Sequence, residues 1–288
     1  MYSNVSNKKP DVNEILLVHR NPQANSFGGA YVFPGGNFDA HQDDSYEMTA
    51  IRETFEESGL LLASSQGSHN ITDTEMDTSR EAVHSQKIVF KDFLAQNNLT
   101  PDTHSLLPFT QWVTPPPAPR RFHARFFVAF LPSVASTGFT SGQVQQRLPT
   151  PDGGQEVIEA RFLHPLAALS EFRAGRISLM PPQYYILVTL ADILQGNVAS
   201  VAQRARVEAL SATPFGSMVV HPHRHHGKEV PEGFACLAYP GDEATGGPKG
   251  RLHRSYIRFS KGTTAEIDLK RNFDMFTELE HTDSKSKL

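Results

Sequence analysis

Three carboxylates recur at helical spacing between residues 53 and 57. Glu53, Glu56 and Glu57 stand at i, i+3 and i+4, so at about 100° per residue they fall within an arc of roughly 100° on one helix face. Such a face is either a solvated acidic surface or, when enclosed, a set of charges that repel by about 3 kcal/mol per pair at ~5 Å. A divalent cation would remove that repulsion, and oxygen ligands favour a hard ion such as Mg²⁺ or Mn²⁺.

The surrounding residues predict the short helix that must position these acids. Apolar side chains fall on the face opposite the acids, where a core would bury them: Met48, Ile51 and Phe55. Residues 44–47 (DSYE) have the pattern of a capping box, and Gly59 stands where a left-handed residue would end the helix. The preceding residues 33–36 (FPGG) let the backbone turn tightly and approach a ligand or metal closely.

Residues 36–60 resemble the Nudix box, G-x5-E-x7-R-E-U-x-E-E-x-G-U, in which U is aliphatic or aromatic. The second half matches in register over residues 52–60, with Thr54 as a mild departure at the first U. In the first half, the leading glutamate of the box falls on Asp44, and Gly36 lies two residues further upstream than the pattern requires. The loop between the glycine and the helix is therefore expected to be two residues longer.

This resemblance implies a fold, a cofactor and a set of roles. The fold would be α+β, an α/β/α sandwich with a mixed β-sheet between helices. Mg²⁺ or Mn²⁺ would be bound by Glu53 and Glu57, with the Gly36 carbonyl completing the coordination. Glu56 would be an additional ligand or a base acting through water, and Arg52 would orient the glutamates by ion pairing. Which glutamate is the general base stays open, because Nudix subfamilies differ on that point.

A second cluster combines aromatic and cationic side chains over residues 112–127 (WVTPPPAPRRFHARFF). It is either a core strand whose charged members face solvent or a wall for an anionic ligand, since arginine binds phosphate bidentately and an aromatic ring stacks on a purine. The run resembles W-x-T-P…R-F-D-T-x-F-F of one Nudix branch, the peroxisomal acyl-CoA diphosphatases, with His123 and Ala124 as departures. Four residues are candidate substrate contacts: Arg20, Trp112, Arg121 and Arg125.

The last three residues, Ser286-Lys287-Leu288, match the peroxisomal import signal, which predicts the peroxisomal matrix and an import receptor as partner. Peroxisomal Nudix enzymes cleave CoA esters or NADH. The NADH-cleaving branch carries a four-cysteine zinc module, whereas Cys236 is the only cysteine here. The resemblance therefore predicts hydrolysis of the diphosphate bond of CoA or acyl-CoA, giving 3′,5′-ADP and (acyl-)4′-phosphopantetheine.

Two alternatives stay open. One is hydrolysis of another nucleoside diphosphate derivative, such as NADH or ADP-ribose. The other is a Nudix-fold module that binds CoA or a nucleotide without cleaving it. The intact Arg-Glu-x-x-Glu-Glu run at residues 52–57 argues against this second alternative, because decayed modules usually lose those acids.

Composition narrows the classes of partner. The net charge of −4 and the pI near 6.3 indicate no general surface for nucleic acid or anionic membranes. The sequence has no run of 18 apolar residues and no apolar core of a signal peptide near its N-terminus. We therefore expect a soluble protein that is neither secreted nor inserted in a membrane.

Periodicity and turn residues predict one Nudix domain with additions. Residues 1–12 are expected to be a flexible N-terminus, 13–212 the Nudix domain, 213–280 a C-terminal β extension packed on the core, and 281–288 an exposed tail. Within the domain, the polar residues 63–79 predict a surface insertion or flexible loop. Strands are expected at residues 14–20, 30–33, 106–113, 122–131 and 156–163. Helices are expected at residues 80–97, 165–174, 181–195 and 198–210.

Three further features have both a structural and a chemical interpretation. The histidines of residues 221–226 (HPHRHH) predict an exposed loop with incidental affinity for nickel or zinc, or else a metal site. Cys236, within an apolar run, is expected to be a core residue. Glu156 opens a predicted strand, and it is either a strand residue or the late glutamate that helps to hold metal or water in many Nudix enzymes.

Overall fold

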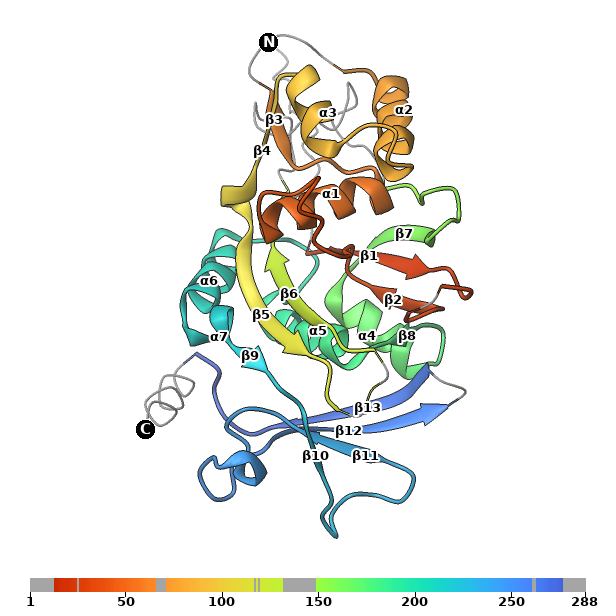
Figure 1. The fold of residues 1–288 in the computed structure, drawn as a ribbon. Helices are drawn as coiled ribbons and strands as arrows, with labels where there is room; N and C mark the ends of the chain where they lie inside the picture. Colours follow the sequence, from red (N-terminus) through yellow and green to blue (C-terminus); the bar gives the residue numbers. More distant parts are fainter. Residues whose placement is uncertain are drawn as a thin grey trace, which may run out of the picture.

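The computed structural model describes residues 13–24, 26–65, 71–116, 118, 120–131, 149–260 and 263–276 (Figure 1). Helices lie on both sides of two small sheets, and a third sheet lies at the C-terminal end of the chain. The predicted flexible N-terminus and the tail that carries Ser286-Lys287-Leu288 lie outside the described residues.

Two mixed sheets form the middle layer. The first contains β1 (Ile15–Arg20), β2 (Ala30–Val32), β7 (Val157–Leu163) and β8 (Ser178–Leu179), and the second contains β5 (Leu107–Val113), β6 (His123–Val128) and β9 (Val219–Val220). In the first sheet, ordered β7-β1-β2-β8, β1 is antiparallel to both neighbours and β2 is parallel to β8. In the second, ordered β6-β5-β9, β5 is antiparallel to β6 and parallel to β9.

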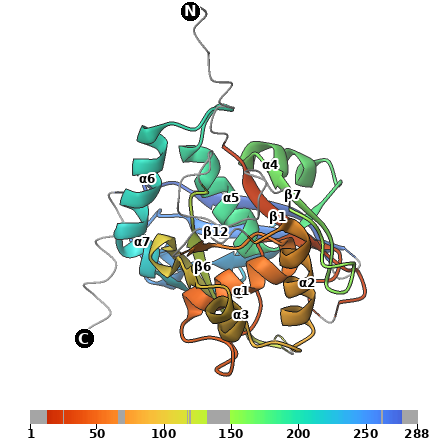
Figure 2. The ribbon, with the colours of Figure 1, turned by 90° about the horizontal axis from the view of Figure 1, so that it is seen from above.

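Helices cover both sides of this layer (Figures 1 and 2). One side carries α1 (Tyr46–Ser58), α2 (Asp73–His84) and α3 (Phe90–Gln96), with the short antiparallel pair β3 (Ala63–Ser65) and β4 (Leu99–Pro101). The other side carries α4 (Pro165–Arg173), α5 (Pro181–Ile193), α6 (Val201–Ala212) and α7 (Pro214–Ser217). Single 3₁₀ turns span Thr103–Ser105 and Glu243–Thr245. This arrangement confirms the expected α+β fold with mixed sheets between helices.

Helix α1 forms where the sequence predicts it, but its N-cap is Ser45 and not Asp44, the first residue of the predicted capping box. Ser45, the second residue of the predicted capping box, accepts a hydrogen bond from the Met48 N–H at 3.2 Å. Gly59, with φ of 74°, ends the helix and donates its N–H to the Phe55 carbonyl at 2.8 Å. The buried ring of Phe55 stacks on Phe93 of α3 with centroids 5.3 Å apart. The apolar face of α1 is therefore packed against α3. Glu53, Glu56 and Glu57, here called the acidic stripe, lie on the remaining face.

The segment after α1 differs from the expectation. Residues 63–79 were expected to be an insertion or loop, yet they contain β3 and the first half of α2, and the single helix expected at 80–97 is wrong. A capping box begins α2: the Thr72 hydroxyl accepts from the Glu75 N–H at 3.3 Å, and the Glu75 carboxylate accepts from the Thr72 N–H at 2.8 Å. Gln86, at φ of 56°, separates α2 from α3. Within residues 73–79, the polar side chains that suggested a loop lie mostly on the exposed face of α2.

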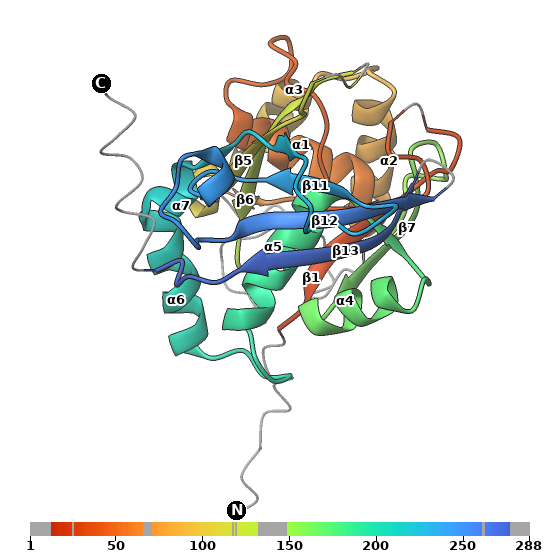
Figure 3. The same ribbon diagram turned by 90° about the horizontal axis from the view of Figure 1, so that it is seen from below.

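A third sheet packs against α5. It contains β10 (His223–His225), β11 (Ala235–Ala238), β12 (His253–Ser260) and β13 (Thr263–Arg271), paired antiparallel in that order. Figure 3 shows β12 and β13 running across α5, where Ile257 and Ile267 are buried with Leu187 of the helix. The extension therefore shares the core of the preceding domain, while its boundary at residue 213 stays a prediction.

The structure places the histidine tract of residues 221–226 and Cys236 within this region. The histidine tract, expected to be a loop, contains the edge strand β10, and His225 Nε2 lies 2.7 Å from Glu229 Oε1. The expectation of a loop is wrong there because three consecutive residues, 223–225, pair with β11, a contact that local composition does not indicate. Cys236 is 1% exposed, which confirms it as a core residue.

His253, the first residue of β12 in the third sheet, is buried against Tyr185 of α5. Its Nδ1 donates to the Pro240 carbonyl at 2.7 Å, and its Nε2 accepts from the Tyr185 hydroxyl at 2.8 Å. Burial lowers the pKa of His253 to about 4. The imidazole is therefore neutral in the folded protein at neutral pH.

This histidine is expected to make the fold less stable in mild acid. The unfolded chain binds the proton near pH 6.5 and the folded chain does not, so the free energy of unfolding falls between pH 7 and pH 5 by about 2 kcal/mol from this group. Urea unfolding at the two pH values measures the change. His253→Gln should show a correspondingly smaller pH dependence, and the same dependence in both proteins would refute the assignment.

Candidate active site

The loop of residues 33–38 runs along α1 and meets its acids. The Gly35 N–H donates to Glu57 Oε2 at 2.9 Å. Gly36 lies against Glu53 so closely that a Cβ at this position would overlap the Glu53 carboxylate. The tight turn predicted at residues 33–36, here called the glycine corner, therefore lies beside two of the three predicted acids. Gly36 is the residue of this turn that leaves space for Glu53.

Gly36→Ala is expected to lower turnover by about tenfold or more, because the added methyl group must displace the Glu53 carboxylate. Asn37→Ala is the matched control, since it changes the next residue of the loop and keeps the backbone carbonyl. Steady-state rates of the two variants in the presence of Mg²⁺ measure the effect. Equal rates for Gly36→Ala and the wild type would show that Glu53 tolerates displacement.

Arg52 connects the acids to the loop. Only 4% exposed, it binds Asp43 bidentately, with Nε to Oδ1 at 2.8 Å and Nη2 to Oδ2 at 2.9 Å. Its Nη1 lies 2.9 Å from Glu53 Oε1 and 3.1 Å from Glu56 Oε1, and its Nη2 also donates to the Asn37 carbonyl at 3.0 Å. This geometry supports the predicted orienting role of Arg52, and it adds Asp43, which the sequence did not indicate.

Burial makes the acidic stripe electrostatically strained. It raises the pKa of Glu53 to about 7, against the lowering effect of Arg52 and with the raising effect of Glu56. It raises the pKa of Glu57 to about 8, against the hydrogen bond from Gly35 and with the charge of Glu53. A divalent cation near these carboxylates would lower both pKa values by supplying the missing positive charge.

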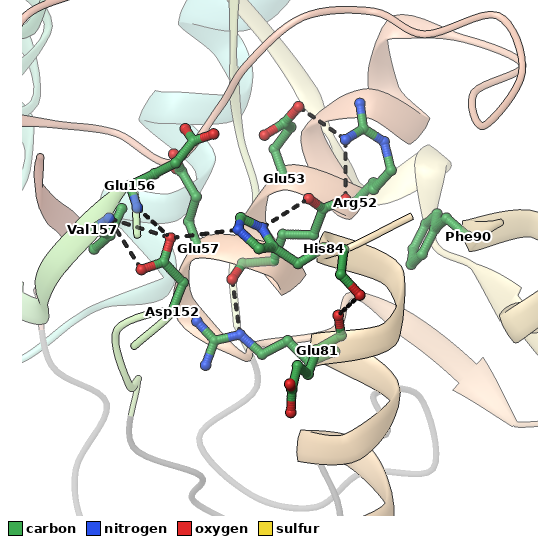
Figure 4. Close-up of polar contacts among 12 residues, drawn as sticks. Arg52, Glu53, Glu57, Glu81, His84, Phe90, Asp152, Glu156 and Val157 are labelled. Carbon is green, nitrogen blue, oxygen red and sulfur yellow. Dashed lines mark hydrogen bonds and ion pairs between the residues drawn. The ribbon is translucent and has the colours of Figure 1, made fainter. Parts of the chain in front are cut away.

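Helix α2 supports Glu56 through two side chains, and Figure 4 shows one of them, His84, pointing toward the acidic helix. Arg80 Nε donates to the Glu56 carbonyl at 2.8 Å, and His84 Nδ1 lies 3.3 Å from Glu56 Oε2. His84 Nε2 faces the buried Asp152 Oδ2 at 4.0 Å. The hydrogen bond with Glu56 raises the pKa of His84. Both Glu56 oxygens therefore have partners, Arg52 on one and His84 on the other.

Arg20 and Glu156 also reach the acids. Arg20, the last residue of β1, places Nη1 3.4 Å from Glu57 Oε1 and Nη2 3.3 Å from Glu156 Oε2. Its buried Nε has no hydrogen-bond partner among the described residues. Glu156, which immediately precedes β7, has a side chain that is 53% exposed. Among the described residues, the site thus has one buried N–H without a partner. A fourth carboxylate, that of Glu156, lies beside the stripe (Figure 4).

Of the other three predicted substrate contacts, one lies in the core and two lie on the surface. Trp112 is 4% exposed, donates to Thr110 Oγ1 at 3.0 Å and packs its ring against Tyr185. It is a core residue, so we leave it out of the proposed substrate contacts. Arg121 and Arg125 lie exposed on the β5–β6 hairpin, where ligands can reach them.

The donor set fits a hard divalent cation. Glu53 and Glu57 bring carboxylate oxygens to the glycine corner, and burial, together with repulsion between the acids, raises their pKa values. Within the part of the chain that the structure describes, no three His, Cys, Asp or Glu side chains form a finished metal-binding group. The fit therefore rests on the chemistry and crowding of the donors. Glu56, with both oxygens paired, is a weaker candidate ligand than Glu53 and Glu57.

The fold and this arrangement of acids, arginine and glycine corner are those expected of the Nudix class. The family model described as NUDT19 Nudix domain matches residues 40–190, just over half of the chain, and the chain belongs to this family. The family model and two of the curated relatives relate it to the acyl-CoA diphosphatase branch of the Nudix proteins.

Curated relatives are distant. The chain is 25% identical over 182 residues to "Putative nudix hydrolase 7" of Caenorhabditis elegans, covering 62% of this chain and 56% of the relative. It is 24% identical over 257 residues to "Acyl-coenzyme A diphosphatase NUDT19" of Xenopus laevis, covering 68% and 64%. The chain thus spans less than two thirds of the length of these relatives. Among solved structures, a NUDIX hydrolase from Alicyclobacillus acidocaldarius has a TM-score of 0.49 at 22% identity, covering 66% of this chain and 87% of the other.

Proposed function

We propose that the protein hydrolyses the diphosphate bond of CoA or acyl-CoA with Mg²⁺ or Mn²⁺, releasing 3′,5′-ADP and (acyl-)4′-phosphopantetheine. The observation that carries the proposal is the pair Glu53 and Glu57, crowded at the glycine corner with pKa values raised towards and above neutrality. The substrate class is taken from relatives named acyl-coenzyme A diphosphatase and from the exposed Arg121 and Arg125 of the β5–β6 hairpin.

Each residue has a defined task in this proposal. Glu53 and Glu57 hold the metal, which when bound neutralises diphosphate charge and lowers the pKa of water. Arg52 fixes the Glu53 and Glu56 side chains in place. Arg20, whose guanidinium lies beside Glu57 and Glu156, supplies positive charge next to the diphosphate. Glu56 accepts a proton through water or completes the metal coordination, and the assignment of the general base stays open.

A product assay tests this function. The full chain is incubated with CoA, acetyl-CoA, NADH and ADP-ribose at equal concentration, with Mg²⁺, Mn²⁺ or EDTA. Metal-dependent release of 3′,5′-ADP from the CoA compounds at the highest rate is the expected result. Faster cleavage of NADH or ADP-ribose would favour the other nucleoside diphosphate derivatives. Tight CoA binding without turnover would favour the non-catalytic module.

The peroxisomal matrix stays part of the proposal, and it rests on Ser286-Lys287-Leu288. Among the described residues, no helix has the length and apolar character needed to cross a membrane. A fluorescent protein fused ahead of residue 1 should accumulate in peroxisomes, and removal of the last three residues should abolish this. Diffuse fluorescence of both fusions would refute recognition by the import receptor.

A further inference from the structure

Two exposed aromatic side chains and an arginine form a cluster at the start of α1. The rings of Phe38 and Tyr46 lie 5.2 Å apart between centroids, and each residue is 44% exposed. The guanidinium carbon of Arg125 lies 3.9 Å above the centre of the Tyr46 ring. We call Phe38, Tyr46 and Arg125 the aromatic platform. Large exposed aromatic side chains that gather beside a cation are a common feature of binding surfaces.

The aromatic platform is aligned with the acidic stripe. Tyr46 precedes Glu53 by seven residues and Glu57 by eleven, so at about 100° per residue the three side chains fall within roughly 40° on one face of α1. Seven residues correspond to a rise of about 10.5 Å, a distance comparable with the length of one nucleotide. Phe38 belongs to the same loop as Gly36, which lies against Glu53.

Arg125 is oriented by the ring and has donors to spare. No hydrogen bond or ion pair of its guanidinium is found among the described residues, although its contact with Tyr46 restricts its position. A guanidinium that stacks through its face keeps its N–H fork available for a phosphate. A ring for a base and a fork for a phosphate together match a nucleotide that carries a phosphate beside its base.

We propose that the aromatic platform binds the 3′-phosphoadenosine half of the substrate, with the purine on the exposed rings and the 3′-phosphate on Arg125. This proposal rests on the proposed function, because it assumes that the diphosphate lies at Glu53 and Glu57. It distinguishes substrates with a 3′-phosphate from those without one. The substrate class is thus a 3′-phosphorylated adenosine diphosphate ester.

Kinetics on two substrates test the phosphate contact. Arg125→Gln should raise KM for CoA about tenfold with little change in kcat, and it should leave KM for dephospho-CoA, which lacks the 3′-phosphate, nearly unchanged. Arg120→Gln, an exposed arginine on the same hairpin, should leave both values unaltered. Equal changes for the two substrates, or no change for either, would overturn the assignment of Arg125.

Binding experiments test the base contact and separate this proposal from the catalytic one. Phe38→Ala should weaken 3′,5′-ADP and 5′-AMP alike by about tenfold in calorimetry, because a stacking surface is lost. Phe259→Ala, an exposed aromatic on β12, is the control and should change neither affinity. If the wild type binds 3′,5′-ADP no more tightly than 5′-AMP, the aromatic platform is not the subsite. If the wild type binds 3′,5′-ADP more tightly than 5′-AMP but cleaves no CoA, only the catalytic proposal fails.

Discussion

Glu57→Gln is expected to reduce turnover of a CoA ester by about a hundredfold or more while leaving the fold intact. Glutamine keeps an oxygen that accepts the Gly35 N–H and removes the charge that a metal requires. The Glu57 side chain is only 2% exposed, and burial already raises its pKa, so the neutral isostere should not lower stability. Glu53→Gln should also reduce turnover, because it removes a charge that a metal requires from a carboxyl group whose pKa is raised by burial.

The matched control is Glu81→Gln on α2. Glu81 is exposed, and in Figure 4 its carboxylate points away from the acidic stripe. This variant should keep the wild-type kcat with Mg²⁺. Urea unfolding of all three variants separates lost chemistry from lost structure, and binding of Mn²⁺ followed by electron paramagnetic resonance reports the metal directly. Near-normal turnover of both Glu53→Gln and Glu57→Gln would remove their proposed roles.

Arg52→Met is expected to lower the free energy of unfolding by about 3–5 kcal/mol, the largest effect on stability among these predictions. The variant removes the bidentate partner of the Asp43 carboxylate. Because the Asp43 side chain is 0% exposed, water cannot compensate for the lost charge. The double variant with Asp43→Asn should recover part of the loss by removing the uncompensated charge. Activity should stay low in both, since Glu53 and Glu56 lose their common partner.

Arg258→Met provides the comparison for Arg52. Arg258 and Glu266 form a pair at 2.7 Å with both side chains about half exposed, and such surface pairs contribute only about 0–1 kcal/mol. Chemical unfolding at pH 7 measures both substitutions. If Arg52→Met and Arg258→Met cost the same, the buried connection between Asp43 and α1 has no special weight in the fold.

The sequence predicted α1 and its acids because their positions follow from one local period. The cap at Ser45, the end at Gly59 and the buried Phe55 all depend on residues a few positions apart. Arg52, one turn before Glu56, could be predicted as its partner in the same way, but the second partner, His84, and the Asp152 that faces His84 could not. His84 and Asp152 lie 28 and 96 residues further along the chain, and only tertiary packing brings them near. One signal in the sequence could have indicated these contacts. Arg80 and His84 stand at i and i+4, on one face of α2, and basic side chains so placed favour acidic partners.

Trp112 shows a second limit of pattern reading. Its proximity in sequence to several arginines suggested a ligand wall, yet its ring packs with Tyr185 and Tyr239 in the core. Both faces of the middle layer are covered by helices, so alternation along β5 does not distinguish a side that faces a ligand from a side that faces a helix. Arg125, on the neighbouring strand, is exposed, and the same stretch therefore contains one core residue and one accessible cation.

The parallel pairing of β9 with β5 bears on how the protein can be divided for expression. The family match spans residues 40–190, but β1 and β2 precede it and β9 follows it. A fragment cut at those limits would lack Arg20 and Gly36, and it would leave the backbone edges of β5 and β7 open to other chains. Recombinant work on the hydrolase thus requires the flanking strands, since the homologous stretch is shorter than the folding unit.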